Sequence, residues 1–265
     1  ACGRHLDNLE KAAFLAYVDS HIREDKWSLD ACVGRALQSG EFDRCELVCT
    51  KTLYRYVDLG LMGTRNHNLL EKLKRNTKAQ HIRKNKKKLG RSIEERPEEV
   101  ENRQEFGHWE ADLVVGQKSG NDQVLLTLVE RKSREYWMLP IKNCHADFVM
   151  EAFHVLQKTY SEHFNQVFKT ITIDNSSGFS RLSELEELTE TLVFYTHPYT
   201  SCEKGTNERH NGIIRRFIPK GKRISDFDVD YIADIEIWCN SLSRKILNYR
   251  APDEVFEDEL DRIYR

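Results

Sequence analysis

Hydrophobic residues after Glu105 gather into short runs that are rich in β-branched and aromatic side chains. Three of these runs, WEADLVVG, QVLLTLVE and REYWMLPI, follow one another with only polar or glycine-containing turns between them. Two later runs, FKTITID and TLVFYT, are separated by longer segments. Short apolar runs bounded by turn signals are typical of β-strands. We therefore expect five strands in this part of the chain.

Helical spacing of apolar residues predicts the elements between and after the later strands. Within residues 145–163, the side chains that share one helical face are Phe148, Val149, Ala152, Phe153, Leu156 and Tyr160. A short helix is expected over SRLSELEEL, and further helices over 205–218 and 227–248. Three consecutive strands followed by alternating helices and strands are the element order of a ribonuclease-H-like α/β domain. We expect residues 105–265 to form this domain, with a mixed five-stranded sheet and flanking helices.

The N-terminal part shows a different pattern, in which apolar positions recur at helical spacing. One helix is expected over residues 9–24. A second is expected over about 29–39, because Ser28 is a favourable N-cap and Gly40 a favourable terminator. Residues 1–65 are therefore predicted to form an all-α region.

A third helix, KTLYRYVDLG, follows the connection EFDRCELVC, with Thr50 as its expected cap and Gly60 as its end. Two short capped helices joined in this way favour a helix-turn-helix, whose second helix enters the major groove of DNA. The core side of that helix would present Leu53, Tyr56 and Val57. The side left for DNA would present Lys51, Thr52, Tyr54 and Arg55. A small helical bundle without a role in DNA binding is the alternative that this pattern leaves open.

Residues 66–104 lack apolar periodicity and are expected to connect the two domains. The first half has no acidic residue between Lys72 and Arg91, and the second half, SIEERPEEVENRQE, is acidic. The whole chain has a net charge of only −2, so the remainder of the chain is acidic and this segment carries a concentrated positive charge. Such a segment is typical of contact with a phosphate backbone. The basic residues expected to bind DNA here are Lys84, Lys86, Lys87, Lys88 and Arg91.

Composition narrows the class of protein further. In the 265 residues, no apolar stretch approaches the ~18–20 residues of a membrane span. The seven cysteines are scattered and odd in number, which argues against a disulfide framework and for a reducing compartment. We therefore expect neither a membrane protein nor a disulfide-stabilised secreted protein.

Three acidic residues stand in contexts that favour a divalent-metal site. Asp112 lies within WEADLVVG, Asp174 ends FKTITID, and Glu208 opens a helical segment rich in Arg and Lys. Mg²⁺ prefers oxygen ligands, and two such ions about 3.5–4 Å apart can promote in-line attack on a phosphodiester. Without a metal, three clustered carboxylates would repel one another. We therefore expect the three residues to hold metal in front of a polyanion.

Neighbouring positions extend this hypothesis. Asn211 and Arg215 share a helical face with Glu208 by i+3 and i+7 spacing, so we expect both to flank the metals and contact DNA. Glu110 points to the same face of its strand as Asp112, and we expect it at the surface or in support of the site. A positive collar is expected around the cleft, formed by Lys204, Arg209, Arg216, Lys220, Lys222 and Arg223.

Several longer stretches match one known family, namely ERPEEVENRQEFGHWEADLVVG, VLLTLVERKSREY, TITIDN, HPYTSCEKGTNERHNGIIRRFIPKGKRI and SRKILNYRAPDEVFEDEL. From about Trp27 to its C-terminus, the chain resembles the IS-thirty family of bacterial insertion-sequence transposases. These belong to the ribonuclease-H-like DDE transposases and integrases. The resemblance implies that Asp112, Asp174 and Glu208 are the catalytic residues. It also implies that they hold two Mg²⁺ ions, for which Mn²⁺ can substitute.

The resemblance further implies a DNA transposase of the bacterial cytoplasm, associated with the nucleoid. Residues 28–60 would bind the terminal inverted repeats of the element. The three carboxylates would support strand cleavage and strand transfer into target DNA. Because two ends must be joined, we expect a homodimer or larger assembly on double-stranded DNA.

The loop after Asp174 departs from the family pattern, which usually has Gly and Glu where this chain has Ser176 and Gly178. A transposase-derived DNA-binding regulator with weak or no catalysis is therefore the alternative. A plain ribonuclease H is a third candidate, but it would hardly need a helix-turn-helix.

Overall fold

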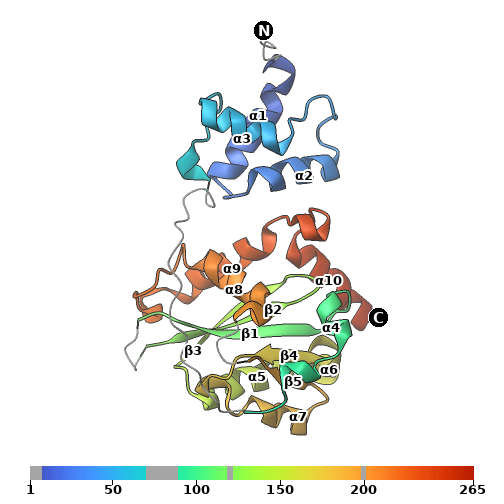
Figure 1. The fold of residues 1–265 in the computed structure, drawn as a ribbon, viewed down its shortest axis with the longest axis vertical. Helices are drawn as coiled ribbons and strands as arrows, with labels where there is room; N and C mark the ends of the chain where they lie inside the picture. Colours follow the sequence, from blue (N-terminus) through green and yellow to red (C-terminus); the bar gives the residue numbers. More distant parts are fainter. Residues whose placement is uncertain (1–7, 70–88, 118–121, 198–200) are drawn as a thin grey trace. The chain divides into compact units, whose positions relative to one another are not determined.

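The structure, a computed structural model shown in Figure 1, describes residues 8–69, 89–117, 122–197 and 201–265. The chain divides into two compact units, and each is described by itself. The first comprises Ala1–Gln80 and Ser241–Ala251, and the second comprises His81–Asn240 and Pro252–Arg265. Within the described residues, no helix is both long and apolar enough to span a membrane.

The second unit is built on a five-stranded sheet in the order β3-β2-β1-β4-β5. Strand β1 pairs antiparallel with β2, and β2 antiparallel with β3, whereas β4 and β5 continue the sheet in parallel. This mixed sheet is the ribonuclease-H-like arrangement that the order of elements predicts. The strands are β1 His108–Val115, β2 Val124–Glu130, β3 Tyr136–Ile141, β4 Thr170–Ile173 and β5 Leu192–Tyr195.

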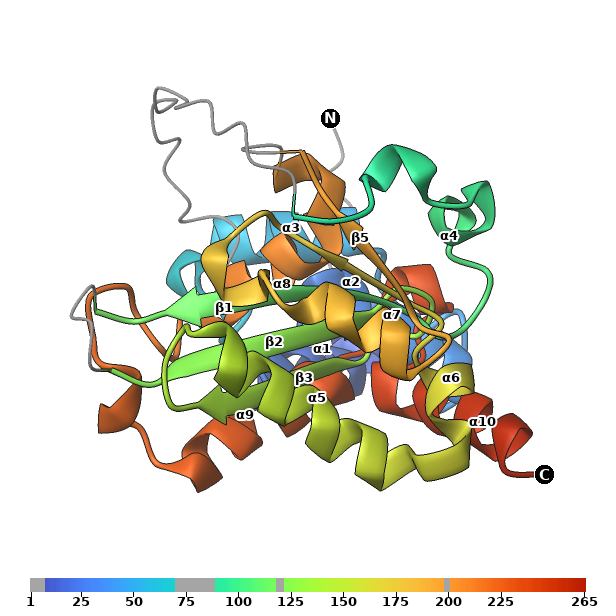
Figure 2. The same ribbon diagram turned by 90° about the horizontal axis from the view of Figure 1, so that it is seen from below.

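Helices cover both faces of this sheet (Figure 2). Helix α5 (Ala146–Tyr160) packs on the face that carries Leu126 and Leu128, together with the shorter α6 (Phe164–Val167) and α7 (Leu185–Leu188). On the opposite face, Leu125 and Val129 pack against α8 (Gly205–Ile214) and α9 (Val229–Ser241). Every side chain of β2 is buried, because alternate residues meet helices on opposite faces. The mostly apolar sequence of this strand has this cause.

The outer edge of the sheet at β3 is closed by two side chains of α9. Asn240 accepts a hydrogen bond from the amide of Tyr136 at 2.9 Å and donates to its carbonyl at 2.9 Å. One turn earlier on α9, Glu236 accepts from the amide of Met138. Unpaired edge amides invite pairing with another chain, so this helix protects the edge.

The opposite edge, at β5, is covered by part of the predicted connector. The amide of Tyr195 donates to the carbonyl of Arg91 at 2.8 Å, and Ser92 forms a parallel bridge with Tyr195. Two short helices follow, η2 (Ile93–Glu95) and α4 (Glu98–Asn102). Residues 89–104 therefore differ from a plain connector.

Burial explains this difference. Val100 of α4 is only 1% exposed, and its carbonyl accepts a hydrogen bond from the buried Arg131 at 3.2 Å. A single apolar side chain and one edge strand produce no periodicity that sequence analysis can detect. The predicted division into 1–65, 66–104 and 105–265 stays a prediction.

The first unit contains α1 (Asn8–Arg23), α2 (Leu29–Ser39) and α3 (Thr50–Leu59), close to the predicted bounds. Ser28 caps α2 as expected, since its hydroxyl accepts from the amide of Ala31 at 3.1 Å. Their buried core consists of Phe14, Val18, Ile22, Leu29, Cys32, Ala36, Val48, Leu53, Val57, Met62 and Leu69.

The predicted start of α3 is wrong by one residue. Cys49 is the N-cap and makes no side-chain capping bond, whereas Thr50 is the first helical residue and its hydroxyl donates to Asp30 at 3.3 Å. Residues 40–49 connect α2 to α3. This connection is longer than the roughly three or four residues of a simple helix-turn-helix.

The C-terminal helices also differ from prediction. The expected helix over 227–248 ends at Ser241, and a separate helix, α10 (Pro252–Ile263), was not expected. Asn248 and Tyr249 both have positive φ, which interrupts a helix. The segment Ser241–Ala251 belongs to the first unit, where the Tyr249 ring lies so close to Gly34 that a Cβ there would meet it at 2.0 Å.

Candidate active site

Two of the predicted carboxylates meet where neighbouring parallel strands bring them together. Asp112 lies within β1, and Asp174 directly follows β4, which pairs with β1. The ammonium group of Lys204 lies 3.1 Å from Asp112 Oδ1 and 3.8 Å from Asp174 Oδ2. The Asp112 and Asp174 side chains are 29% and 41% exposed, so solvent and ligands can reach both.

Asn211 of α8 orients Asp112. Its amide nitrogen donates to Asp112 Oδ2 at 2.7 Å. Its amide oxygen accepts from the Tyr136 hydroxyl at 2.9 Å and from the Thr127 hydroxyl at 3.2 Å. Burial raises the pKa of Tyr136 well above its ordinary value, so this hydroxyl keeps the proton that it donates. Asn211 is thereby engaged with the carboxylate.

The start of α8 is tied to the sheet by Glu110. The amide of Asn207 donates to Glu110 Oε2 at 2.9 Å, and the Asn207 side chain donates to the Glu110 carbonyl at 3.0 Å. Arg131 donates to the other carboxylate oxygen at 2.6 Å. Glu110 is fully buried, so its predicted surface position is wrong, whereas its predicted side of β1 is confirmed because Glu110 and Asp112 both meet α8.

Sequence reasoning missed Asn207 as the partner of this buried carboxylate. A signal was present, because Asn207 and Asn211 are four residues apart on one helix and Glu110 and Asp112 are two apart on one strand. Those spacings match the two periods of helix and strand. The spacings predict that Asn207 and Asn211 share one face of the helix and that Glu110 and Asp112 share one face of the strand. They do not predict that the helix face packs on the strand face.

Glu208 is exposed on α8, beside the buried Asn207. Among the residues that the structure describes, no three His, Cys, Asp or Glu side chains are grouped closely enough to hold a metal ion. The structure therefore joins Asp112 and Asp174 and does not gather Glu208 with them. The two joined carboxylates fit a divalent cation, since hard oxygen donors are what Mg²⁺ prefers and a positive group already lies between them.

The loop with the unusual residues holds Asp174 in place. The amide of Ser176 donates to Asp174 Oδ1 at 3.1 Å. Gly178 packs so tightly that a Cβ there would lie 2.4 Å from Leu113 Cδ1 and 2.8 Å from the Cys144 carbonyl. A glutamate at position 178 would not fit this packing. The departure at Gly178 is thus accommodated by the local packing, whereas the Ser176 hydroxyl is buried without a hydrogen-bond partner among the described residues.

Comparison with known proteins places the chain in a family. No protein-family model matches it. A Streptococcus salivarius protein, described as a probable transposase for the insertion-like sequence element IS1161, is 38% identical over 208 residues, which are 78% of this chain and 58% of that protein. The transposase for insertion sequence element IS4351 of Bacteroides fragilis is 30% identical over 244 residues, which are 89% of this chain and 71% of that protein. The chain belongs to the IS30 (IS-thirty) family of insertion-sequence transposases.

A further relative and a solved structure are also similar to the chain. The transposase InsI for insertion sequence element IS30A of Escherichia coli strain K12 is 26% identical over 243 residues, covering 88% of this chain and 62% of that protein. The chain thus spans about three fifths of the length of the Streptococcus and Escherichia relatives. Among solved structures, the catalytic core domain of BIV integrase covers 60% of this chain and 99% of that domain, with 16% identity and a TM-score of 0.44.

In this member of the IS30 family, the residues predicted to contact DNA differ in exposure. On α3, Lys51, Tyr54 and Arg55 are exposed, whereas Thr52 is half-buried and its hydroxyl lies 3.1 Å from the Cys49 thiol. The opposite side of α3 faces the core as predicted, with Leu53 and Val57 buried and Tyr56 partly buried. Three of the four side chains of α3 that were predicted to contact DNA are thus exposed.

The remaining predicted contacts are partly engaged within the protein. Arg91 forms an ion pair with Glu186 at 3.4 Å. Arg215 is half-buried and donates to the Val115 carbonyl at 2.8 Å, and burial lowers its pKa. The predicted contacts Lys84, Lys86, Lys87 and Lys88 lie outside the described residues.

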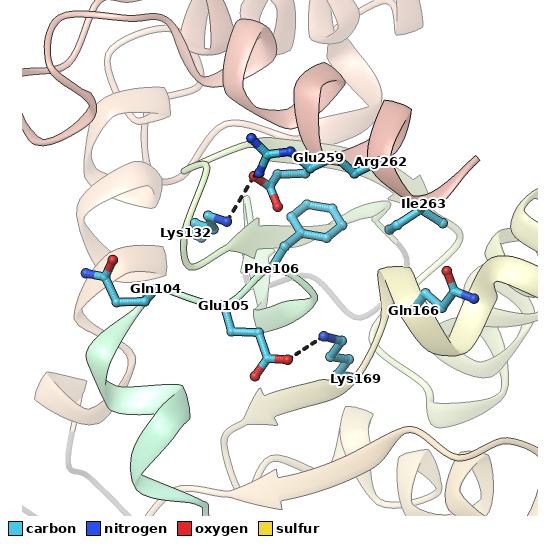
Figure 3. A pocket seen from close by; sticks show the side chains of 9 residues that line it. All are labelled: Gln104, Glu105, Phe106, Lys132, Gln166, Lys169, Glu259, Arg262 and Ile263. Atoms are coloured by element: carbon cyan, nitrogen blue, oxygen red, sulfur yellow. Dashed lines mark hydrogen bonds and ion pairs between the residues drawn. The ribbon is translucent and has the colours of Figure 1, made fainter. Parts of the chain in front are cut away.

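A separate polar pocket of about 500 Å³ lies near the start of β1 (Figure 3). Its charged groups pair with one another, as Figure 3 shows: Lys132 with Glu259 at 2.9 Å, and Lys169 with Glu105. Hydrogen bonds from Lys169 and then His108 lower the pKa of Glu105. The other residues that line the pocket are Gln104, Phe106, Gln166, Arg262 and Ile263.

Proposed function

We propose that this chain is the DNA-binding and catalytic part of an IS30-family transposase. It binds the terminal inverted repeats of an insertion sequence, cuts a strand at the element's end and joins that end to target DNA. The observation that carries the proposal is the meeting of Asp112 and Asp174 around one positive group at neighbouring strands. Family membership supports it, since the relatives are named transposases.

Asp112, Asp174 and Glu208 would hold two Mg²⁺ ions, with Mn²⁺ able to substitute. Bound metal would supply an activated water and stabilise charge on the phosphate. Asp112 and Asp174 offer oxygen donors that are already ordered by hydrogen bonds to Asn211 and to the Ser176 amide. Glu208 would complete the set from α8, where its side chain is exposed.

The chain's own part in the reaction is positioning. Asn211 would keep Asp112 oriented, and the buried contact between Glu110 and Asn207 would keep α8 at the correct height on the sheet. After cleavage, the 3′-hydroxyl of the element would attack a phosphodiester of target DNA in the same site. This transesterification exchanges one phosphodiester for another and needs no external energy source.

DNA would be bound outside this site as well. Helix α3 would enter the major groove with Lys51, Thr52, Tyr54 and Arg55. The segment that carries Lys84, Lys86, Lys87, Lys88 and Arg91 would bind backbone with a steep salt dependence, and Arg215 would contact DNA beside the carboxylates. Because two ends must be joined, a homodimer or larger assembly would act, in the bacterial cytoplasm at the nucleoid.

A second candidate is a DNA-binding regulator of the same origin with weak or no catalysis. Exposed Glu208 favours it, together with the lack of a three-acid group among the described residues. The hydrogen bond from the Ser176 amide to Asp174 and the close packing of Gly178 argue against it, because both fix the loop beside Asp174.

Cleavage of duplex DNA that carries the element's ends separates the two candidates. With Mg²⁺, we expect the wild-type chain to cut and join, and D112N, D174N and E208Q each to lose at least about a hundredfold in rate, the upper end of losses for outer-shell changes at metal sites. D261N, an exposed Asp→Asn change on α10, is the matched control and should keep the rate. Binding without cutting by the wild type would establish the regulator instead.

A further inference from the structure

The Lys204 ammonium group contacts more than the two carboxylates. Besides Asp112 and Asp174, it donates to the Ala111 carbonyl at 3.1 Å, so three oxygen atoms surround one positive charge. The Lys204 side chain is only 9% exposed. Burying an ammonium group is costly unless it is paired, so its position depends on these oxygens.

The hydrogen bonds of the carboxylates are divided in a regular way. Asp112 uses Oδ2 to accept from Asn211 and presents Oδ1 to Lys204. Asp174 uses Oδ1 to accept from the Ser176 amide and presents Oδ2 to Lys204. Each carboxylate is thus held by a neutral donor through one oxygen, and its other oxygen is directed at the same cation. Two carboxylates arranged in this way would repel each other if that cation were absent.

We propose that Lys204 is a resident counter-ion of the active site, which holds Asp112 and Asp174 close together until a divalent cation displaces it. The inference rests on the proposed function, in which these two carboxylates are metal ligands. Metal and ammonium group compete for the same two oxygens. The neutral donors remain in place during the exchange, so the carboxylates keep their orientation.

Competition between Lys204 and the metal predicts a change in Mn²⁺ affinity that a lysine with only a structural role would not cause. In K204Q, the amide can still donate to the Ala111 carbonyl, but the competing charge is gone. Mn²⁺ should then bind about tenfold more tightly, equivalent to about 1.4 kcal/mol. K204R keeps the charge and should bind within about twofold of wild type. K158Q removes an equal charge from an exposed position on α5 and serves as the matched control.

The affinities are measured on the full 265-residue chain, at fixed ionic strength, from the electron paramagnetic resonance signal of free Mn²⁺. Lysine acetylation followed by mass spectrometry provides a second readout on the wild-type protein. Lys204 should be protected without metal and should react several times faster at saturating Mn²⁺. In the D112N/D174N double variant, Lys204 should react fast without any metal.

The outcomes separate this inference from the proposed function. Unchanged or weaker Mn²⁺ binding by K204Q, while D112N/D174N abolishes binding, overturns the counter-ion and leaves the transposase proposal intact. If specific Mn²⁺ binding survives in D112N/D174N, both the counter-ion inference and the proposed function are overturned. The same holds if the wild type binds no Mn²⁺ specifically. If K204Q fails to fold by circular dichroism, Lys204 acetylation in the wild type decides: metal-independent reactivity overturns the counter-ion, and metal-dependent reactivity supports it.

Discussion

Two clusters of acidic and basic side chains lie on the α/β unit, and they differ in the number of basic groups available to each carboxylate. In the pocket near the start of β1, each carboxylate has a basic partner of its own, as in the pairs Lys132–Glu259 and Lys169–Glu105. In the candidate active site, two carboxylates share the single ammonium group of Lys204. In the pocket, the protein itself pairs both acids, and Arg262 is a second basic partner of Glu259. The active site keeps a negative excess that a metal ion can satisfy.

The clusters also differ in what holds their charged groups. The pocket pairs are partly exposed, and Lys169 and Glu105 are 39% and 45% exposed. Ion pairs of this kind contribute little to stability, typically about 0–1 kcal/mol. The active-site carboxylates are instead anchored by neutral donors on packed elements. Orientation in the site is therefore independent of the charge that occupies it, which suits a group that exchanges its partner.

The largest expected effect tests the support behind the active site. R131M should lower the free energy of unfolding by about 3–5 kcal/mol, because it removes the ion-pair partner of the fully buried Glu110 carboxylate. K132M in the pocket should cost about 1 kcal/mol or less. Denaturant unfolding measures both values. Equal losses of unfolding free energy in R131M and K132M would show that the buried pair Arg131–Glu110 contributes no more to stability than the partly exposed pair Lys132–Glu259.

Metal-linked stabilisation separates the clusters next. At Mn²⁺ concentrations about a hundred times the Kd, the wild type should gain about 2.7 kcal/mol of stability. D112N/D174N should lose this gain, whereas E105Q/E259Q in the pocket should keep it. Thermal unfolding with Mn²⁺ and with chelator measures the difference. If the stability gained from Mn²⁺ disappears in E105Q/E259Q, the metal binds in the pocket and not at Asp112 and Asp174.

Glu236 provides a third kind of carboxylate, one held at the sheet edge by the Met138 amide. Burial raises its pKa to about 7. Because the folded-state pKa lies above the ordinary value, the stabilising contribution is complete at pH below about 4.5 and is lost as pH rises through 7. The wild type should therefore lose roughly 2 kcal/mol relative to E236Q between pH 5 and pH 8.

The comparison for Glu236 is the difference between wild type and E236Q in unfolding free energy at each pH. Glutamine retains an acceptor for the Met138 amide but does not ionise. Taking the difference removes the titration of other groups. A difference that stays constant with pH would show that the carboxylate ionises at its ordinary pKa.

The smallest expected effect concerns the orientation of Asp112. N211A should weaken Mn²⁺ binding roughly tenfold, as for other changes behind a metal ligand, and slow strand cleavage by a similar factor. DNA affinity through α3 should be unchanged in a gel-shift assay. Unchanged Mn²⁺ affinity combined with weaker DNA binding would instead support a direct DNA contact for Asn211.

Local patterns were sufficient for much of the fold. The runs around Asp112 and Asp174 predicted their strands because short runs rich in β-branched and aromatic residues, bounded by turn signals, are typical of strands. Helix α2 was predicted closely because its cap, Ser28, and its terminator, Gly40, lie in the sequence itself. These signals arise within a few residues, so no knowledge of the rest of the chain was needed.

Other elements escaped prediction because their causes are distant in sequence. Residues 89–104 are ordered by an exposed strand edge at Tyr195 and a buried site for Val100. The helix expected to continue to residue 248 ends at Ser241 and gives way to a segment in which Asn248 and Tyr249 adopt positive φ and the Tyr249 ring packs against Gly34. Neither cause leaves a periodic trace.

The sequence by itself determined the order of the elements along the chain and placed Asp112 within one strand and Asp174 at the end of another, because side-chain periodicity and chemical type are local properties. Only the tertiary structure decided the neighbours of those acids. It brought Lys204 between Asp112 and Asp174 and turned Asn211 onto Asp112. The reason is physical: contacts between α8 and the sheet depend on how deeply the helix is seated, which the buried pairing of Glu110 with Asn207 and Arg131 determines.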